Sequence, residues 1–414
     1  MGPSNKLPGR AQTGPRPGAG RAGPLEGVRV VDLSIGQMGP AATALLADMG
    51  AEVIKIESRH GDPGRGVELQ PNGVSAFFLT HNRGKKSVTL NLRHAEGKEV
   101  VCRLAARSDV FVQSWTPGVV ERLALDYESV RQHNPSIIYA SATGFGPKGP
   151  QAHLPAMDMV AQGVGGLMMA NASPQGGEPI PVGPTIADQT GAFLLACGIL
   201  LALFHRERTG QGQQVDASLL GGMIALQGWH ISHYLLTGGM ALMSSQRTQR
   251  SPLFTYYRAR DAWFTIAIID PRQWPALCRI VGLPELESDP RFAETRSRNE
   301  RAAELIAILD QRFAGEPRDH WLRLLEAAEI PCGPVSSYAE LVEDEQVIAN
   351  DYVVEQSEPR LGQVRLPGLA VRLSESPGQL RPAPELGQHT EEVLRDLDYS
   401  WEEIGRLRDS RTIL

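Results

Sequence analysis

The stretch "LEGVRVVDLSIGQMGPAATALLADMGAEVIKIE", residues 25–57, decides the fold class of this chain. Two apolar runs of strand length, 27–33 and 51–57, enclose a segment of helix length, 39–50, that ends at a glycine. A strand, a helix and a second strand joined by short connections are typical of a βαβ unit with parallel strands. The first connection, "DLSIGQMGPAA", lacks the GxGxxG spacing, so it does not indicate a dinucleotide site.

The same alternation continues after residue 57. The predicted elements are strands at 86–92, 109–115 and 136–146, and helices at 95–108, 118–125 and 127–133. We therefore expect an α/β fold with a Rossmann-like parallel sheet covered by helices on both faces. Ligands of such sheets bind at the carboxyl ends of the strands.

Changes in composition predict the organisation of the whole chain. The first 24 residues are rich in Pro, Gly and Arg, carry no acid and lack the apolar core of a signal peptide, which favours a disordered tail. The last segment contains two predicted helices that can dock back on the first domain. The predicted parts are a tail (1–24), the first part of a large domain (25–235), a polar linker (236–253), a small α+β domain (254–340) and a return segment (341–414).

Bulk composition excludes several classes of function. The chain has 414 residues and a net charge of −6, so no global basic field favours nucleic acid. Its four cysteines are far apart and show no metal-ligand spacing, which indicates reduced thiols in a cytoplasmic protein and no metal site. Asp188 and Gln189 interrupt the apolar run at 186–204, so we expect a buried core helix and no membrane span.

Asp188 is the only formally charged residue from Pro179 through Phe204. In one interpretation "TIAD" is close to a capping box, and Asp188 stabilises the first turn of a helix. In the other, a carboxylate beside apolar surface at a strand-end loop is partly desolvated and acts as a nucleophile toward acyl groups. Asp158 also precedes an apolar, Gly-rich helix and admits the same two kinds of interpretation.

Basic residues recur near the predicted strand ends. Together they indicate an anionic ligand that carries phosphates, because guanidinium groups match phosphate oxygens. Trp115 and Met38, at the same edge, are candidates to pack on an adenine ring, and each is equally a candidate for the core. The basic residues are Arg59, Arg65, Arg83, Lys85, Lys86, Arg93, Arg122 and Lys148.

An ordered set of motifs from residue 25 to residue 414 resembles the family III CoA-transferases, the group of formyl-CoA transferase and carnitine CoA-transferase. The set includes "NRGKKSVTLNL", "DVFVQSWTPGVVERLAL", "IIYASATGFGPKGP", "RTGQGQQVDASLL", "IPCGPVSS" and "APELGQHTEEVL". The resemblance implies a large Rossmann-like domain built from both chain ends, a smaller central domain and an interlocked homodimer. It also implies an acyl-CoA thioester and a carboxylic acid as substrates, with no permanently bound cofactor.

The resemblance also assigns roles to individual residues. "GPTIADQTG" places Asp188 as the nucleophile that forms an aspartyl mixed anhydride and then an aspartyl-CoA thioester, and Gln37 as support for the acyl group. The family often has arginine where Ser58 stands, so Arg59 is the shifted candidate for that contact. The other implied CoA-site positions are Met38, Leu90, Arg93, Trp115, Arg122, Met157 and Asp158.

Two alternatives share this fold. A 2-methylacyl-CoA racemase needs proton-transfer groups on both faces of the α-carbon, and racemases of this type use a histidine in "GHD". Here the corresponding residues read "AMD", and the thioether of Met157 cannot transfer protons. A non-catalytic CoA-binding relative is the other alternative, and the intact sequence around Asp188 argues against it.

Overall fold

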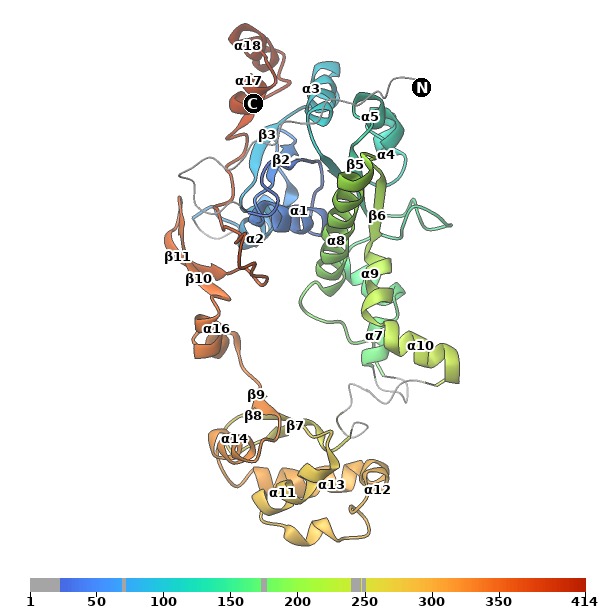
Figure 1. Ribbon diagram of the computed structural model, residues 1–414, viewed down its shortest axis with the longest axis vertical. Helices are drawn as coiled ribbons and strands as arrows, with labels where there is room; N and C mark the ends of the chain where they lie inside the picture. Colours follow the sequence, from blue (N-terminus) through green and yellow to red (C-terminus); the bar gives the residue numbers. More distant parts are fainter. Residues whose placement is uncertain (1–22, 69–71, 173–176, 240–246, 248–250) are drawn as a thin grey trace, which may run out of the picture.

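The structure is a computed structural model that describes residues 23–68, 72–172, 177–239, 247 and 251–414. The predicted tail (1–24) lies almost entirely outside the described residues, as does most of the predicted linker (236–253). The molecule is elongated, with a larger α/β lobe at one end and a smaller lobe at the other (Figure 1).

Six parallel strands form the sheet of the larger lobe, in the order β3-β2-β1-β4-β5-β6. The predicted α/β fold with a parallel Rossmann-like sheet is confirmed. The strand order reverses between β1 and β4, and the crevice at such a switch point is where doubly wound sheets bind ligands. The strands are β1 (Arg29–Asp32), β2 (Glu52–Glu57), β3 (Lys86–Thr89), β4 (Val110–Gln113), β5 (Ile138–Thr143) and β6 (Gln214–Ser218).

Helices cover both faces of this sheet because successive strand residues point to opposite sides. Val30 and Val53 pack under α1 (Met38–Asp48) and α8 (Ile186–Thr209), whereas Val31, one position later, packs on the other side. The remaining helices of the larger lobe are α2 (Ala76–Asn82), α3 (Ala95–Ala106), α4 (Val119–Leu123), α5 (Tyr127–His133), α6 (Asp158–Val164), α7 (Leu167–Asn171), α9 (Leu219–Leu226) and α10 (Gly228–Thr237).

Helix α8 has one buried and one exposed face. It packs against α1, α9, β5 and β6, and Gly191 permits the close approach, since a Cβ there would lie 2.9 Å from Met38 Sδ. By length and a mean hydropathy of 1.8 the helix could cross a membrane, but 39% of its apolar stretch is buried inside the protein. Phe193, Leu201 and Phe204 are exposed. The apolar run is thus a core helix on one side and an unpartnered surface on the other.

The end of the chain returns to the outer edge of the sheet. Helices α17 (Thr390–Asp396) and α18 (Trp401–Asp409) contribute to the core on the α3 side, and the backbone of Asn91 donates to the carbonyl of Thr412 at 2.8 Å. Figure 1 shows these C-terminal helices close to β3, although about 300 residues separate the two segments. Between the lobes lie α15 (Tyr338–Leu341), α16 (Glu345–Ala349) and the hairpin β10 (Val353–Glu358) and β11 (Gly362–Pro367).

The smaller lobe has its own hydrophobic core, built on an antiparallel sheet of β7 (Phe254–Arg258), β8 (Trp263–Ala267) and β9 (Cys332–Pro334). The sequence did not predict β9. Two helices of this lobe, α12 (Thr295–Glu300) and α13 (Ala302–Phe313), meet at Arg301, and α10 of the larger lobe extends into the predicted linker. The other helices are α11 (Trp274–Ile280) and α14 (Arg318–Ala327).

Candidate active site

Asp188 is the third residue of α8 and is half-buried. Its carboxylate accepts a hydrogen bond from the backbone N–H of Met38, the first residue of α1. Burial, reinforced by the nearby charge of Asp158, raises the pKa of Asp188 to about 6, and the Met38 N–H opposes this rise. The arrangement creates a carboxylate that is ionised at neutral pH and more basic than an ordinary aspartate.

Asp158, at the start of α6, holds the N-terminus of α8. Its Oδ1 accepts from the backbone N–H groups of Ala187 at 2.7 Å and Asp188 at 3.2 Å, and its Oδ2 accepts from Gln162 Nε2 at 2.6 Å. The first N–H groups of a helix have no partner within the helix, so this carboxylate satisfies two of them. The capping-box interpretation of "TIAD" is wrong, because Thr185 makes no side-chain cap.

Gln37 connects the β1–α1 loop to the turn before α8. It is almost fully buried, and its Nε2 donates to Thr185 Oγ1 at 2.5 Å. The next residue, Met38, donates its N–H to Asp188 but packs its side chain into the core against Gly191. The Met38 side chain therefore lies in the core between α1 and α8, as one of its two interpretations expected, and its contact with an adenine stays a prediction.

A cleft of about 750 Å³ lies at the switch point of the sheet, within the usual size range of small-molecule sites. Four residues predicted for the CoA site come together in it. The β1–α1 loop also lines it, through Leu33 and Ile35, and the same loop reaches Asp188 three residues later, about 10 Å along an extended chain. The four residues are Arg59, Leu90, Arg93 and Trp115.

Six of the eight basic residues near the strand ends divide into two groups. Arg59 and Arg93 line the cleft and form no ion pair within the described part of the chain. Arg122 is exposed on α4 and is not a lining residue, although Val119 and Leu123 of that helix are. The other group forms internal ion pairs, namely Arg65–Glu57 (2.7 Å), Arg83–Asp48 (2.7 Å), Lys85–Asp32 (3.0 Å) and Lys86–Glu52 (2.7 Å).

The expectation that this second group faces a phosphate ligand is wrong. Strand β3 begins at Lys86, so Arg83, Lys85 and Lys86 lie at or before the amino end of the strand rather than at its carboxyl end. Arg65 is turned inward to Glu57 and stacks on Phe78, with 3.8 Å from its guanidinium carbon to the ring centre.

Met157 and Asp158 do not line the cleft. Met157 is 76% exposed at the start of α6, and Asp158 is buried with both carboxylate oxygens engaged by the protein. The observed contacts of Asp158 hold α8 in place, and the expectation that Met157 and Asp158 bind CoA stays a prediction. No proton-transferring side chain occupies the Met157 position.

Several residues of the site carried no signal in the sequence. Gln162 holds Asp158, Thr185 accepts from Gln37, and Gln189 lies 3.2 Å from His81, measured between Nε2 atoms. Burial lowers the pKa of His81 to about 4, so its ring is neutral at physiological pH. These pairs are distant in sequence or involve common polar residue types, and no local pattern identifies them.

Two other features lie away from this site. A larger cavity of about 1220 Å³ is lined by the first residues of β1 and β2, among others, at the opposite edge of the sheet. Within the part of the chain that the structure describes, no three His, Cys, Asp or Glu side chains gather in a way that could hold a metal ion.

Comparisons with known proteins indicate the same family as the sequence motifs. The family model described as CoA-transferase family III matches residues 25–390. A succinyl-CoA:glutarate CoA-transferase of Mus musculus is 35% identical over 90% of this chain and 86% of its own length. A formyl-CoA:oxalate CoA-transferase of Streptomyces coelicolor is 34% identical over 94% of this chain and 99% of its own length.

A solved structure shares the fold over nearly the whole chain. It is the crystal structure of a CAIB/BAIF family protein from Brucella suis, which superposes with a TM-score of 0.82 at 32% sequence identity. The match covers 91% of this chain and 100% of the Brucella chain.

Proposed function

Because this chain belongs to CoA-transferase family III and is an enzyme of the CoA-transferase type, we propose that it moves CoA between acyl groups through covalent intermediates on Asp188. The observation that carries this proposal is the environment of the Asp188 carboxylate. This carboxylate is half-buried and has a pKa raised to about 6. It accepts the N–H of Met38, which follows the β1–α1 loop that also lines the switch-point cleft.

The reaction begins with attack of the Asp188 carboxylate on the thioester carbonyl of the donor. The C–S bond breaks, CoA leaves as a thiolate, and a mixed anhydride joins Asp188 to the donor acyl group. The thiolate then attacks the aspartyl carbonyl of the anhydride, which releases the donor as a free carboxylate and leaves an aspartyl-CoA thioester.

The acceptor repeats these two steps in reverse. Its carboxylate attacks the aspartyl thioester and expels CoA thiolate, and the thiolate attacks the acceptor carbonyl of the new anhydride. Acyl-CoA of the acceptor leaves, and the Asp188 carboxylate is restored. No net proton is transferred, so the cycle requires no general acid or base.

The electrostatics of the site favour this chemistry. The N–H groups at the first turn of α1 have no partner within the helix and carry partial positive charge. The Met38 N–H therefore stabilises negative charge at Asp188, both on the free carboxylate and on the oxygen that becomes anionic in the two steps that attack the aspartyl carbonyl. The thioether at Met157 disfavours the racemase alternative, which needs a proton-transfer group there.

For the substrates, we propose a short dicarboxylate as the acceptor. The named relatives act on glutarate and on oxalate, both of which are dicarboxylates. For the donor, we propose a CoA ester whose nucleotide occupies the switch-point cleft, with Trp115 against the base and Arg59 and Arg93 near the phosphates.

We also propose that the active form is an interlocked homodimer. Helix α8 has an exposed apolar face, and α10 also carries exposed apolar side chains, since Trp229, Leu235 and Leu236 are more than half exposed. Apolar surface of this extent marks an interface, and a second copy of the chain is its proposed occupant. If the chains are interlocked, tagged and untagged dimers will not exchange subunits on mixing unless they are first unfolded.

A matrix of CoA donors against carboxylic acids, read by the mass of new thioesters, tests the function. We expect succinyl-CoA or formyl-CoA to yield a dicarboxylate thioester, with no product when the acid is omitted. Release of free acid and CoA without an acceptor would indicate a hydrolase. Rapid α-deuteration of a (2R)-methylacyl-CoA in D₂O would indicate a racemase.

A further inference from the structure

Two lysine side chains are completely buried between the sheet and helices α1 and α2. Lys55 comes from β2 and Lys85 from the link between α2 and β3, and neither side chain is exposed. Burying an ammonium group costs several kcal/mol unless it is paired and fully hydrogen-bonded. The contacts that offset this cost are therefore informative about what the lysines hold.

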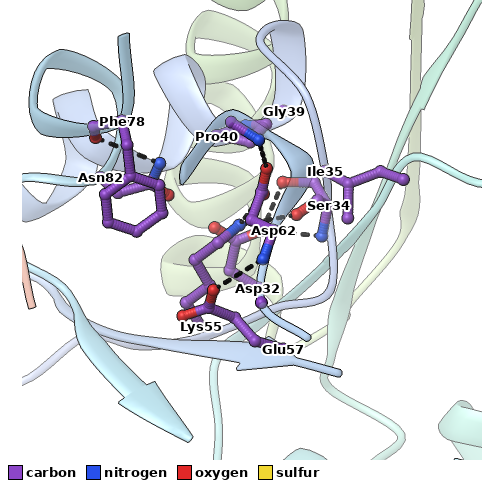
Figure 2. Close-up of polar contacts among 12 residues, drawn as sticks. Asp32, Ser34, Ile35, Gly39, Pro40, Lys55, Glu57, Asp62, Phe78 and Asn82 are labelled. Atoms are coloured by element: carbon purple, nitrogen blue, oxygen red, sulfur yellow. Dashed lines mark hydrogen bonds and ion pairs between the residues drawn. The ribbon is translucent and has the colours of Figure 1, made fainter. Parts of the chain in front are cut away.

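Each lysine donates to a backbone carbonyl near the start of α1. Lys55 Nζ donates to the Ser34 carbonyl in the β1–α1 loop at 2.9 Å, and Lys85 Nζ donates to the Pro40 carbonyl in the first turn of α1 at 2.9 Å. Figure 2 labels Lys55, Ser34 and Pro40 in this cluster. The two carbonyls bracket residues 35–39, which contain Gln37, the donor to Thr185, and Met38, which donates its N–H to Asp188.

Acidic partners hold each ammonium in place. Lys55 pairs with Asp62 at 2.8 Å, and Lys85 pairs with Asp32 at 3.0 Å. Asp32 also accepts from the backbone N–H of Ser34 at 2.9 Å and from Thr43 Oγ1 at 2.7 Å. Asp32, the last residue of β1, thus contacts the start of the loop, helix α1 and Lys85.

The charges in this cluster reinforce one another. Burial alone would raise the pKa of Asp32, but the positive charges of Lys85 and Lys55 hold it well below its usual range. Burial lowers the pKa of Lys85 to about 8, against the opposing effect of Asp32. At neutral pH Asp32 and Lys85 are both ionised, and the loop cannot move without separating charged hydrogen bonds in a low-dielectric interior.

We propose that the Lys85–Asp32 pair, together with Lys55, is a positioning device that aims the Met38 N–H at the Asp188 carboxylate. The proposal rests on the proposed function of Asp188 but names residues that never touch a substrate. A shift of the loop by a fraction of an ångström changes the Met38–Asp188 hydrogen bond directly, because both anchoring carbonyls lie within four residues of Met38.

The same helix offers a matched control. At the C-terminal end of α1, Arg83 pairs with Asp48 at 2.7 Å, with 15% and 0% of the two side chains exposed. That pair joins α1 to the α2–β3 link, as Lys85 does, but it lies at the end of the helix remote from Asp188. A purely structural role predicts the same consequences for losing either pair, whereas positioning does not.

The experiment compares the charge-balanced double variants Asp32→Asn/Lys85→Met and Asp48→Asn/Arg83→Met, measured with succinyl-CoA and a dicarboxylate acceptor. We expect the first to lower kcat by about 30-fold, with KM for the CoA ester within about twofold of wild type. We expect the second to leave kcat and KM within about twofold of wild type. It should lower the melting temperature about as much as the first variant does. Equal effects of both variants on kcat, or none from the first, would overturn the proposal.

A second readout requires no turnover. Losing the Met38 hydrogen bond raises the pKa of Asp188 in the folded protein, so the pH above which the stabilisation by Asp188→Asn stops increasing moves upward in the Asp32→Asn/Lys85→Met background. Asp158 of α6 is the charged group that faces Asp188, and the buried His81 of α2 lies against the neighbouring Gln189. No movement of that pH would contradict the proposal even if wild type proved to have another activity.

A milder variant covers failure of the double variant to fold. Thr43→Val removes one donor to Asp32 and leaves no unpaired charge in the interior. We expect a smaller fall in kcat, about threefold, with KM unchanged. A change in KM alone would count against positioning.

Discussion

The carboxylate of Asp158 accepts the backbone N–H of Asp188 at 3.2 Å, so a second acid holds the helix turn that carries the proposed nucleophile. One residue thereby has two effects. Its hydrogen bonds to Ala187 and Asp188 fix the start of α8, and its charge adds to burial in raising the pKa of Asp188 to about 6.

The charge of Asp158 can be removed while its hydrogen-bond acceptor is retained. In Asp158→Asn, an amide oxygen still accepts the two N–H groups, but the neighbouring negative charge is lost. We expect the acid limb of the kcat/KM profile, near pH 6 in wild type, to move to lower pH by about one unit. Asp126 caps α5 in a similar way by accepting the N–H of Ser129, so Asp126→Asn is the control and should leave the acid limb of the profile unchanged. A limb that stays near pH 6 in Asp158→Asn would contradict this assignment.

Stability should also report the ionisation of Asp188. Its pKa is about 6 in the folded protein and ~3.9 in an unfolded chain, so the folded state binds more protons between these values. The free energy of unfolding therefore falls as pH rises through that range. We expect Asp188→Asn to raise the melting temperature by about 2–4 °C at pH 7.5, with little change at pH 4, close to the unfolded-state pKa. Thermal scans at the two pH values measure this, and equal effects at both would be inconsistent with a raised pKa.

The two unpaired arginines of the cleft should act on CoA binding. We expect Arg93→Met to raise KM for the CoA ester about tenfold with little change in kcat, because a contact to phosphate is lost equally from ground state and transition state. Initial rates at several ionic strengths provide the measurement, and the difference from wild type should shrink as salt is added. Arg103→Met, on the exposed side of α3, is the control and should change neither constant.

The exposed face of α8 should be required for assembly. Leu201 is 64% exposed in the isolated chain, and we expect Leu201→Arg to prevent dimer formation, as measured by light scattering coupled to gel filtration. Leu324→Arg, at an exposed position on α14 of the smaller lobe, is the matched control and should remain dimeric. A Leu201→Arg protein that elutes as a dimer would place the interface elsewhere.

Much of the fold could be predicted from the sequence because its signals are local. The strand and helix periodicities around 27–57 indicated the parallel sheet, and the ordered motifs indicated the family, which the comparisons confirm. Strand β9 was missed because it is only three residues long and depends on β8 for its hydrogen bonds.

The site was predictable where a residue type alone restricts the role, and not where long-range packing decides it. Asp188 was notable as a single charge in an apolar run. Lys85 was grouped with the residues expected to face a phosphate ligand, because only the packed structure shows that its ammonium is buried against Asp32, 53 residues earlier. One interpretation of "TIAD" placed the cap of α8 at nearby Thr185, whereas the actual acceptor, Asp158, is 29 residues before the N–H of Ala187.

The most direct test of the account is to trap the acyl-enzyme. Wild-type protein is incubated with succinyl-CoA, treated with hydroxylamine or borohydride, digested and analysed by mass spectrometry, with Asp188→Asn and the exposed-site variant Asp319→Asn in parallel. The account predicts one modified peptide, labelled at Asp188, in wild type and Asp319→Asn and none in Asp188→Asn, which should also lose at least ~10³-fold in transfer rate. A label on another residue, or continued turnover by Asp188→Asn, would contradict it.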